Sequence, residues 1–438
     1  MGNPAKIGLS TAVSLVVANM IGTGVFTSLG FQVVGITDGF SLMMLWLVGG
    51  LISLCGAVVY SELGARFPNS GGEYNFLSEL YHPALGFLAG WVSVTIGFAA
   101  PVAMSSVILA KYTSGVVCIA DEKILAISVI LIITLLHSSN LETGSMFQRF
   151  FTLLKVLVIL FFIACGFFFK QGNYFSVVPT TESVNVIFSG SFAVALYWVT
   201  YSYSGWNAAA YMTSEINHPK KNLPLALILG TLAVTLFYLG LNYVFLNSAP
   251  ISEISGKKEV GLIAARYIFG ENGGNLMGLV IALLLVSAIS AMVMAGPRVT
   301  QAMGHQIPSL RFLSYTGKRN VPFIAILLQS FISIILVLTL SFEFVLQFTA
   351  FSLNLFTFLS VLGVFFLKTK KGENSQAFGF RFSFLFFPAC LFLLVQAWIL
   401  YYGLKEKTNE SLLGFLNLLL GLLFWYSFNA IKKNKNET

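Results

Sequence analysis

Long apolar runs separated by short polar connections extend along the whole of this 438-residue chain. A run of about 18 or more apolar residues is long enough for a helix to cross the hydrocarbon core of a bilayer. Twelve such runs are present, at 7–32, 40–64, 84–113, 124–141, 152–170, 187–214, 224–248, 274–298, 321–341, 343–367, 382–403 and 411–431. The pattern predicts an all-α integral membrane protein with twelve transmembrane helices.

The first run is interrupted at its centre by Gly22-Thr23-Gly24. Glycine inside a helix costs about 1 kcal/mol relative to alanine. Non-helical backbone at membrane depth persists only where it is buried in protein or lines a cavity. The triplet therefore marks either a close contact between helices or a break in the helix.

The sixth run contains a second interruption, the polar segment Thr200–Asn207 with the sequence TYSYSGWN. Interrupted helices at corresponding positions of two halves indicate a transporter built from inverted repeats. We therefore expect a 5+5 inverted repeat of the leucine-transporter type with discontinuous helices 1 and 6. The first repeat would occupy residues 1–170 and the second 171–368, while residues 369–438 would add helices 11 and 12 and a cytoplasmic tail.

Two facing breaks suit a zwitterionic ligand. A helix N-terminus carries unpaired amides and partial positive charge, so the amides near Thr23 and Gly24 are candidates to hold a carboxylate. Carbonyl groups released at the breaks could accept hydrogen bonds from an ammonium group, and glycine lets ligand atoms approach the backbone. The candidate substrate-binding residues are Met20, Ile21, Gly22, Thr23, Gly24, Tyr201, Tyr203, Ser204, Gly205 and Asn207. The alternatives are that Gly22 and Gly24 serve helix packing and that the aromatic residues belong to the core.

Composition agrees with a polytopic chain, because 57% of residues are hydrophobic and only 10% are charged. The net charge of +8 does not indicate nucleic-acid binding, since the basic residues lie in short loops. Lys and Arg number 17 on one side of the predicted topology and 8 on the other. The positive-inside rule therefore places both termini in the cytoplasm of a protein of the cell's plasma (inner) membrane. Four scattered cysteines indicate neither a disulfide framework nor a metal site.

Several motifs together resemble the amino acid–polyamine–organocation superfamily, most closely its L-type amino acid transporter branch and the bacterial relatives of that branch. The resemblance rests on the segments 21–26 (IGTGVF), 60–74 (YSELGARFPNSGGEY), 140–155, 203–224 and 295–298 (AGPR). It implies alternating access around a site between helices 1, 3, 6, 8 and 10. It also places Tyr201 where the branch usually has a gating phenylalanine, and gives Asn207 a contact with the substrate or a role in tying helix 6 down.

Lys155 lies near the start of the fifth run. It could simply extend its ammonium group to the membrane surface. The resemblance instead implies a lysine in the region where sodium-coupled relatives hold their ion. There it would bridge helix 1 to Ser287 or Ser290 on helix 8, as a tether or as a carrier of a coupling proton. His137 is expected to be a hydrogen-bonded packing residue.

Glu62, Glu73, Glu79 and Glu215 fall at predicted cytoplasmic helix ends. We expect ordinary solvated ends rather than ion pairs of an inner gate. Cys118, in a predicted outer loop, corresponds to a loop cysteine with which animal relatives link a glycoprotein subunit. We expect a free thiol here.

The sequence thus predicts a sodium-independent transporter, either an exchanger or a facilitator, for neutral L-amino acids in a lipid bilayer. A proton-coupled symporter for amino acids or polyamines is the alternative. A membrane-embedded enzyme is disfavoured, because it would need converging His, Asp, Glu or Cys at one depth. We expect no catalytic residues, cofactor, metal, nucleic acid or obligatory protein partner.

Overall fold

The computed structural model describes residues 7–139, 141–168, 175–316, 321–367 and 382–436. Within these ranges the regular structure is helical, apart from one isolated bridge between Ile7 and Ile216. The first half contains α1 (Leu9–Met20), α2 (Gly24–Gln32), α3 (Gly39–Arg66), α4 (Glu73–Leu80), α5 (Pro83–Val92), the π-helical turn η1 (Ser93–Gly97), α6 (Ala99–Ser114), α7 (Glu122–Ser139) and α8 (Leu141–Phe168). The second half contains α9 (Thr181–Ile187), α10 (Gly190–Tyr203), the 3-10 helix η2 (Ala208–Glu215), α11 (Pro219–Ser248), α12 (Ile251–Ile254), α13 (Val260–Gln306), η3 (Pro308–Ser314), α14 (Phe323–Thr339), α15 (Phe342–Leu362), η4 (Gly363–Phe366), α16 (Phe382–Glu406) and α17 (Thr408–Asn436).

Ten helices of the described residues are long and apolar enough to cross a membrane. An eleventh span is formed if Thr181–Ile187 and Gly190–Glu215, which meet at an angle of 64°, are counted together. The apolar helix Phe323–Thr339 falls short of the 18-residue length. The fold is therefore that of an all-helical integral membrane protein, and the exact number of twelve spans stays a prediction.

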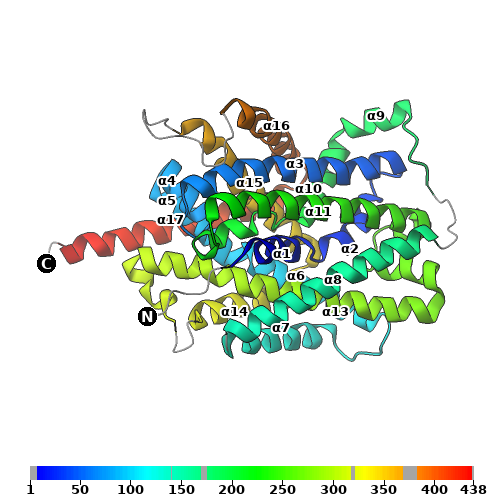
Figure 1. Cartoon of the computed structure of the whole chain (residues 1–438), viewed down its shortest axis with the longest axis horizontal. Coiled ribbons are helices and arrows are strands. Elements are labelled where there is room, and N and C mark those ends of the chain that lie inside the picture. Colours follow the sequence, from blue (N-terminus) through cyan, green and yellow to red (C-terminus); the bar gives the residue numbers. More distant parts are fainter. Residues whose placement is uncertain (1–6, 140, 169–174, 317–320, 368–381, 437–438) are drawn as a thin grey trace.

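Most helices run side by side along the long axis of the molecule (Figure 1). The short helix α4 and the end of α17 lie at one end of this bundle, called here the α4 end, and α9 lies at the opposite, α9 end. The central helices α1, α2 and α10 are enclosed by α3, α8, α11, α13 and α16. This enclosure lets irregular backbone exist at membrane depth, because protein rather than lipid surrounds it.

Both predicted interruptions are breaks in a helix. The first separates α1 from α2 at Ile21–Thr23, where Ile21 leaves the helical region with ψ 85°. The second separates α10 from η2 at Ser204–Asn207, where Gly205 has φ +94°. A positive φ is accessible to glycine but strained for residues with a Cβ atom, so Gly205 permits the sharp change of direction.

The third predicted span is also irregular, because the π-helical turn η1 separates α5 from α6. Such turns inside α-helices are frequent at functional sites. The eighth predicted span, 274–298, lies within a longer helix, since α13 begins at Val260 and continues through a kink at Gly270 with φ +73°. Glycine tolerates this backbone conformation without strain.

Candidate functional site

The two helix breaks touch each other. A Cβ atom added to Gly205 would lie 2.8 Å from the backbone carbonyl carbon of Asn19, at the end of α1. Towards the α4 end, the Ile7 amide donates to the Glu215 carbonyl at 2.8 Å, and the Asn217 amide donates to the Ile7 carbonyl at 2.8 Å. The sequence therefore folds its two interrupted helices into one unit.

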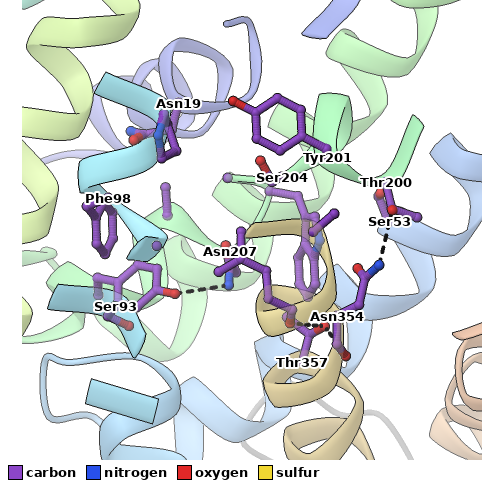
Figure 2. A pocket seen from close by; sticks show the side chains of 18 of the residues that line it. Asn19, Ser53, Ser93, Phe98, Thr200, Tyr201, Ser204, Asn207, Asn354 and Thr357 are labelled. Atoms are coloured by element: carbon purple, nitrogen blue, oxygen red, sulfur yellow. Dashed lines mark hydrogen bonds between the residues drawn. The ribbon is translucent and has the colours of Figure 1, made fainter. Parts of the chain in front are cut away.

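A pocket lies beside this unit (Figure 2). It is lined by Asn19, Ile52, Ser53, Ser93, Gly97, Phe98, Pro101, Thr200, Tyr201, Ser204, Gly205, Trp206, Asn207, Ala208, Tyr211, Met292, Ala350, Leu353, Asn354, Thr357, Phe392 and Gln396. Asn19 and Tyr201 lie on one side of the view, Ser93 and Phe98 on another, and Asn354 and Thr357 on the opposite side of Asn207. The described pocket residues include no Asp, Glu, Lys or Arg, so the cavity is uncharged and half polar.

Four of the predicted substrate-binding residues line this pocket, namely Tyr201, Ser204, Gly205 and Asn207. The remaining six do not line it, namely Met20, Ile21, Gly22, Thr23, Gly24 and Tyr203. Residues of the second break therefore line the cavity directly. Near the first break, the described residue that lines the cavity is Asn19.

The beginning of α2 does present unpaired amides. Among the described residues, no backbone or side-chain acceptor bonds the amides of Thr23, Gly24 and Val25. The Thr23 hydroxyl is buried and lacks a hydrogen bond of normal length in the described structure. Tyr201 lines the pocket and also lies close to Thr23, so its side chain adjoins both the start of α2 and the cavity.

The two glycines of the first break play different structural roles. A Cβ atom on Gly22 would meet no atom within 4 Å, whereas one on Gly24 would lie 2.4 Å from Ser202 Oγ on α10. Ser202 is in turn 2.9 Å from Ser28 Oγ on α2. Gly24 is therefore a small-residue contact between helices, and the helix break itself lies at Ile21–Thr23.

The carbonyls expected to receive a substrate ammonium group are largely occupied. The Met20 carbonyl accepts from the Gly22 amide at 2.9 Å and from the Tyr238 hydroxyl at 2.6 Å. The Ile21 carbonyl accepts from Lys155. The Met20 carbonyl therefore already has two donors within hydrogen-bonding distance. The Ser204 carbonyl, by contrast, accepts no hydrogen bond from the described residues.

Tyr203 and Tyr238 hold the breaks in place from behind. The Tyr203 hydroxyl donates to the Trp46 carbonyl at 2.9 Å, and its ring contacts the Tyr238 ring. The single hydroxyl proton of Tyr238 lies within reach of the carbonyls of Met20 at 2.6 Å and Ser202 at 2.8 Å. Tyr203 is therefore a scaffold residue in this arrangement, and Tyr238 joins the two breaks.

Replacing Tyr238 by phenylalanine should destabilise the protein by about 1–3 kcal/mol, because two buried carbonyl groups lose their shared donor. We expect a lower melting temperature in detergent and weaker substrate binding. The control is Tyr243→Phe on the same helix, where the ring stacks on Phe167 at 5.1 Å. Equal melting temperatures for the two variants would contradict the role given to the Tyr238 hydroxyl.

Lys155 is buried in the middle of α8, with 1% of its surface exposed. Its ammonium group donates to the Ile21 carbonyl at 2.5 Å and lies 3.5 Å from the Ala18 carbonyl. The interpretation that it extends to the membrane surface is therefore wrong. Lys155 supplies a positive charge to the carbonyl end of α1, where the helix dipole favours it.

The expected bridge from Lys155 to α13 is not formed within the described structure. Ser290 Oγ, an expected partner of Lys155, instead lies 2.7 Å from Nε2 of His137 on α7. Ser287 Oγ is buried without a hydrogen-bond partner among the described residues. The prediction that His137 is a hydrogen-bonded packing residue is confirmed.

Below the pocket, towards the α4 end, the carboxylate of Glu73 is 4% exposed and therefore not the solvated helix end that we expected. Glu73 Oε1 accepts from the Asn207 side-chain amide at 2.5 Å and from the Tyr60 hydroxyl at 2.8 Å. Hydrogen bonds to a charged acceptor are stronger than neutral ones. This contact supports the interpretation that Asn207 ties the sixth span down.

Other charges near the α4 end also differ from the expectation. Glu62 is buried and pairs with Arg66 at 2.6 Å, while Glu215 of η2 pairs with Arg298 of α13 at 3.6 Å. Glu79 is exposed, as expected for a helix end. The Glu215–Arg298 pair thus links the end of the sixth span to α13, whereas the Glu62–Arg66 pair lies within α3.

Towards the α9 end, aromatic rings of three helices contact one another. Phe31 of α2 stacks on Trp198 of α10 with ring centroids 4.3 Å apart, and it also contacts Phe342 of α15 at 6.5 Å. Lys258 lies over the Phe342 ring and pairs with Glu343 at 3.0 Å. These contacts link α2, α10 and α15 to one another.

Several residues that line the pocket were not among the predicted substrate-binding residues. Asn19 precedes the first break directly, so the break itself was a signal for it. Asn354, Thr357 and Gln396 are polar residues within apolar runs, which is a general signal of function inside a membrane. Nothing in the sequence indicates that α16, from the last segment of the chain, reaches the pocket through Gln396.

Comparisons with known proteins agree with the motif resemblance. A family model described as amino acid permease matches residues 7–424. The chain is 27% identical to the serine/threonine exchanger SteT of Bacillus subtilis, across 99% of this chain and 98% of that protein. It is 26% identical to the b(0,+)-type amino acid transporter 1 of Mus musculus, across 97% and 88% of the two chains. It is also 26% identical to the large neutral amino acids transporter small subunit 2 of Homo sapiens, across 96% and 80%.

Proposed function

Because this chain belongs to the amino acid permease family, we propose that it transports neutral L-amino acids without sodium, by alternating access, as an exchanger or facilitator. The observation that carries this proposal is the uncharged pocket beside two touching helix breaks. Free amides and a free carbonyl at those breaks suit a carboxylate and an ammonium group, and the lack of charged lining residues suits a neutral side chain.

The substrate carboxylate would bind the unpaired amides of Thr23 and Gly24, while the Ser204 carbonyl would accept from the ammonium group. Tyr201 would act as the gate, because it lines the cavity and also lies close to Thr23 at the start of α2. A carboxylate at a helix N-terminus is favoured by the helix dipole. Gly205 leaves room for the ligand beside the backbone.

Lys155 would replace a sodium ion as the positive charge behind the first break. Its bonds to the Ile21 and Ala18 carbonyls support a tether between α8 and α1. Two contacts would open and close the route of the substrate through the protein. They are the stack of Phe31 on Trp198 towards the α9 end and the hydrogen bond from Asn207 to Glu73 towards the α4 end.

The wider architecture belongs to the same proposal. Helices α1–α8 would form the first repeat and α9–α15 the second, in the inverted arrangement of the leucine-transporter type. The α4 end would face the cytoplasm of the plasma membrane, with both termini on that side. Cys118 is an exposed free thiol, and function would require no second subunit.

The test uses purified protein in liposomes loaded with unlabelled L-serine. We expect radiolabelled L-serine to enter at least about tenfold faster than into empty liposomes if transport is exchange. Choline should replace sodium without loss of rate. Uptake that requires sodium, or no uptake of any neutral amino acid, would contradict the proposal.

The alternative is a proton-coupled symporter. It predicts that an inward proton gradient drives uptake into empty liposomes. A polyamine substrate is less compatible with the pocket, because a cation of that size needs carboxylates and the described lining residues supply none. Putrescine should therefore fail to compete with labelled L-serine.

A further inference from the structure

Two amide side chains in the pocket leave a buried acceptor unused. Asn19, on α1, is 2% exposed, and its side-chain nitrogen donates to the Leu15 carbonyl at 2.8 Å. Gln396, on α16, is 4% exposed. The oxygens Asn19 Oδ1 and Gln396 Oε1 have no hydrogen-bond partner among the described residues. Leaving a buried acceptor unpaired is unfavourable, so each oxygen is a candidate for a bond from a ligand.

The two acceptors belong to different parts of the pocket. Asn19 adjoins both helix breaks, since Gly205 presses against its backbone. Gln396 comes from α16, on the side to which α15 and the end of α10 contribute Asn354 and Thr200. Those two residues are hydrogen-bonded to each other at 3.2 Å (Figure 2). The pocket thus has a break region and a separate polar region.

We propose that Asn19 accepts a hydrogen bond from the substrate ammonium group and that Gln396 selects neutral amino acids whose side chains carry a hydrogen-bond donor. This inference rests on the proposed transport function and names its substrate class, hydroxyl- and amide-bearing amino acids. The Met20 carbonyl already has the Gly22 amide and the Tyr238 hydroxyl within hydrogen-bonding distance, whereas Asn19 Oδ1 has no donor among the described residues. In the polar region, a donor on the substrate side chain would satisfy Gln396 Oε1.

L-threonine and L-valine provide a matched pair of probes, because they have the same shape and differ by a hydroxyl in place of a methyl group. A site built to hydrogen-bond a hydroxyl rejects an analogue that lacks it, whereas an apolar pocket discriminates such isosteres weakly. We expect the wild-type protein in liposomes to prefer L-threonine over L-valine by about tenfold or more in competition with labelled L-serine.

Gln396→Met should bring this threonine-to-valine ratio to within about twofold while L-valine is still bound. Thr357→Val changes a second polar residue of the pocket without changing its shape. It should also reduce the threonine-to-valine ratio, and it replaces Gln396→Met as the test if that variant does not fold. Gln347→Met is the matched control, because Gln347 is a buried glutamine on α15 outside the pocket. It should leave the ratio unchanged.

Asn19→Leu should weaken the binding of L-threonine and L-valine equally, since both carry the same ammonium group. Equal affinity of the wild type for the two probes would overturn the role of Gln396, as would an unchanged ratio in both pocket variants. If L-valine and L-threonine are both transported without preference, only this inference fails. If no neutral amino acid is transported, L-serine included, the proposed function fails.

Discussion

Replacing Gly205 by alanine is expected to abolish transport. The new Cβ atom would lie 2.8 Å from the Asn19 carbonyl carbon, and the residue would have to keep φ +94°. A non-glycine residue in the left-handed region costs about 1–2 kcal/mol, and forcing extra volume into a packed site costs about 1–3 kcal/mol. The two breaks would separate, so substrate binding should fall by about 100-fold or more.

The measurement is binding of L-serine to the purified variant, together with its uptake into liposomes. Gly256→Ala is the matched control, because Gly256 has φ +71° but its Cβ atom would meet nothing within 4 Å. That variant carries the backbone strain without the collision. A Gly205→Ala protein that binds L-serine as well as Gly256→Ala does would show that the contact between the breaks is dispensable.

The second large effect is expected from Lys155→Met. Methionine retains most of the buried apolar volume but leaves the carbonyls of Ile21 and Ala18 without the ammonium donor. A hydrogen bond to a charged group contributes about 1.5–3 kcal/mol, so the exchange rate should fall by about 10- to 150-fold. Sodium should not restore it, because the ammonium group is the charge that the site uses.

Lys111→Met is the control for this experiment. Lys111 is partly exposed and forms an ion pair with Glu122 at 3.5 Å. Such surface pairs contribute about 1 kcal/mol or less, so exchange should change by no more than a few-fold. The same liposomes separate the two roles of Lys155. A tether predicts exchange that is insensitive to a proton gradient, whereas a proton carrier predicts gradient-driven uptake that Lys155→Met abolishes.

The sequence placed the two helix breaks correctly. Glycine and clustered polar residues at mid-membrane depth are costly unless protein encloses them, so their positions along the chain are informative by themselves. The same argument identified Lys155 as more than a surface residue once the motif resemblance was added. The sequence also predicted correctly that His137 is a hydrogen-bonded packing residue.

The predictions made from the sequence were wrong where the role of a residue depends on its neighbours on other helices of the bundle. Glu73 was expected in solvent, but Asn207 and Tyr60 enclose its carboxylate. Ser290 was expected to bond Lys155, but His137 occupies it. Hydrogen bonds between distant helices follow from packing, and no local pattern of apolar and polar residues records which helix lies opposite.

By itself, then, the sequence determined the membrane-embedded helical class, the family and the segment Gly22-Thr23-Gly24 as one of two breaks. These properties depend on residue type and spacing along one chain. Only the tertiary structure decided that Gly24 packs against Ser202. It also decided that Asn19, next to the first break, lines the pocket and that α16 contributes Gln396 to the same lining. These properties depend on which helices pack together, because only packing determines which buried groups remain free for a ligand.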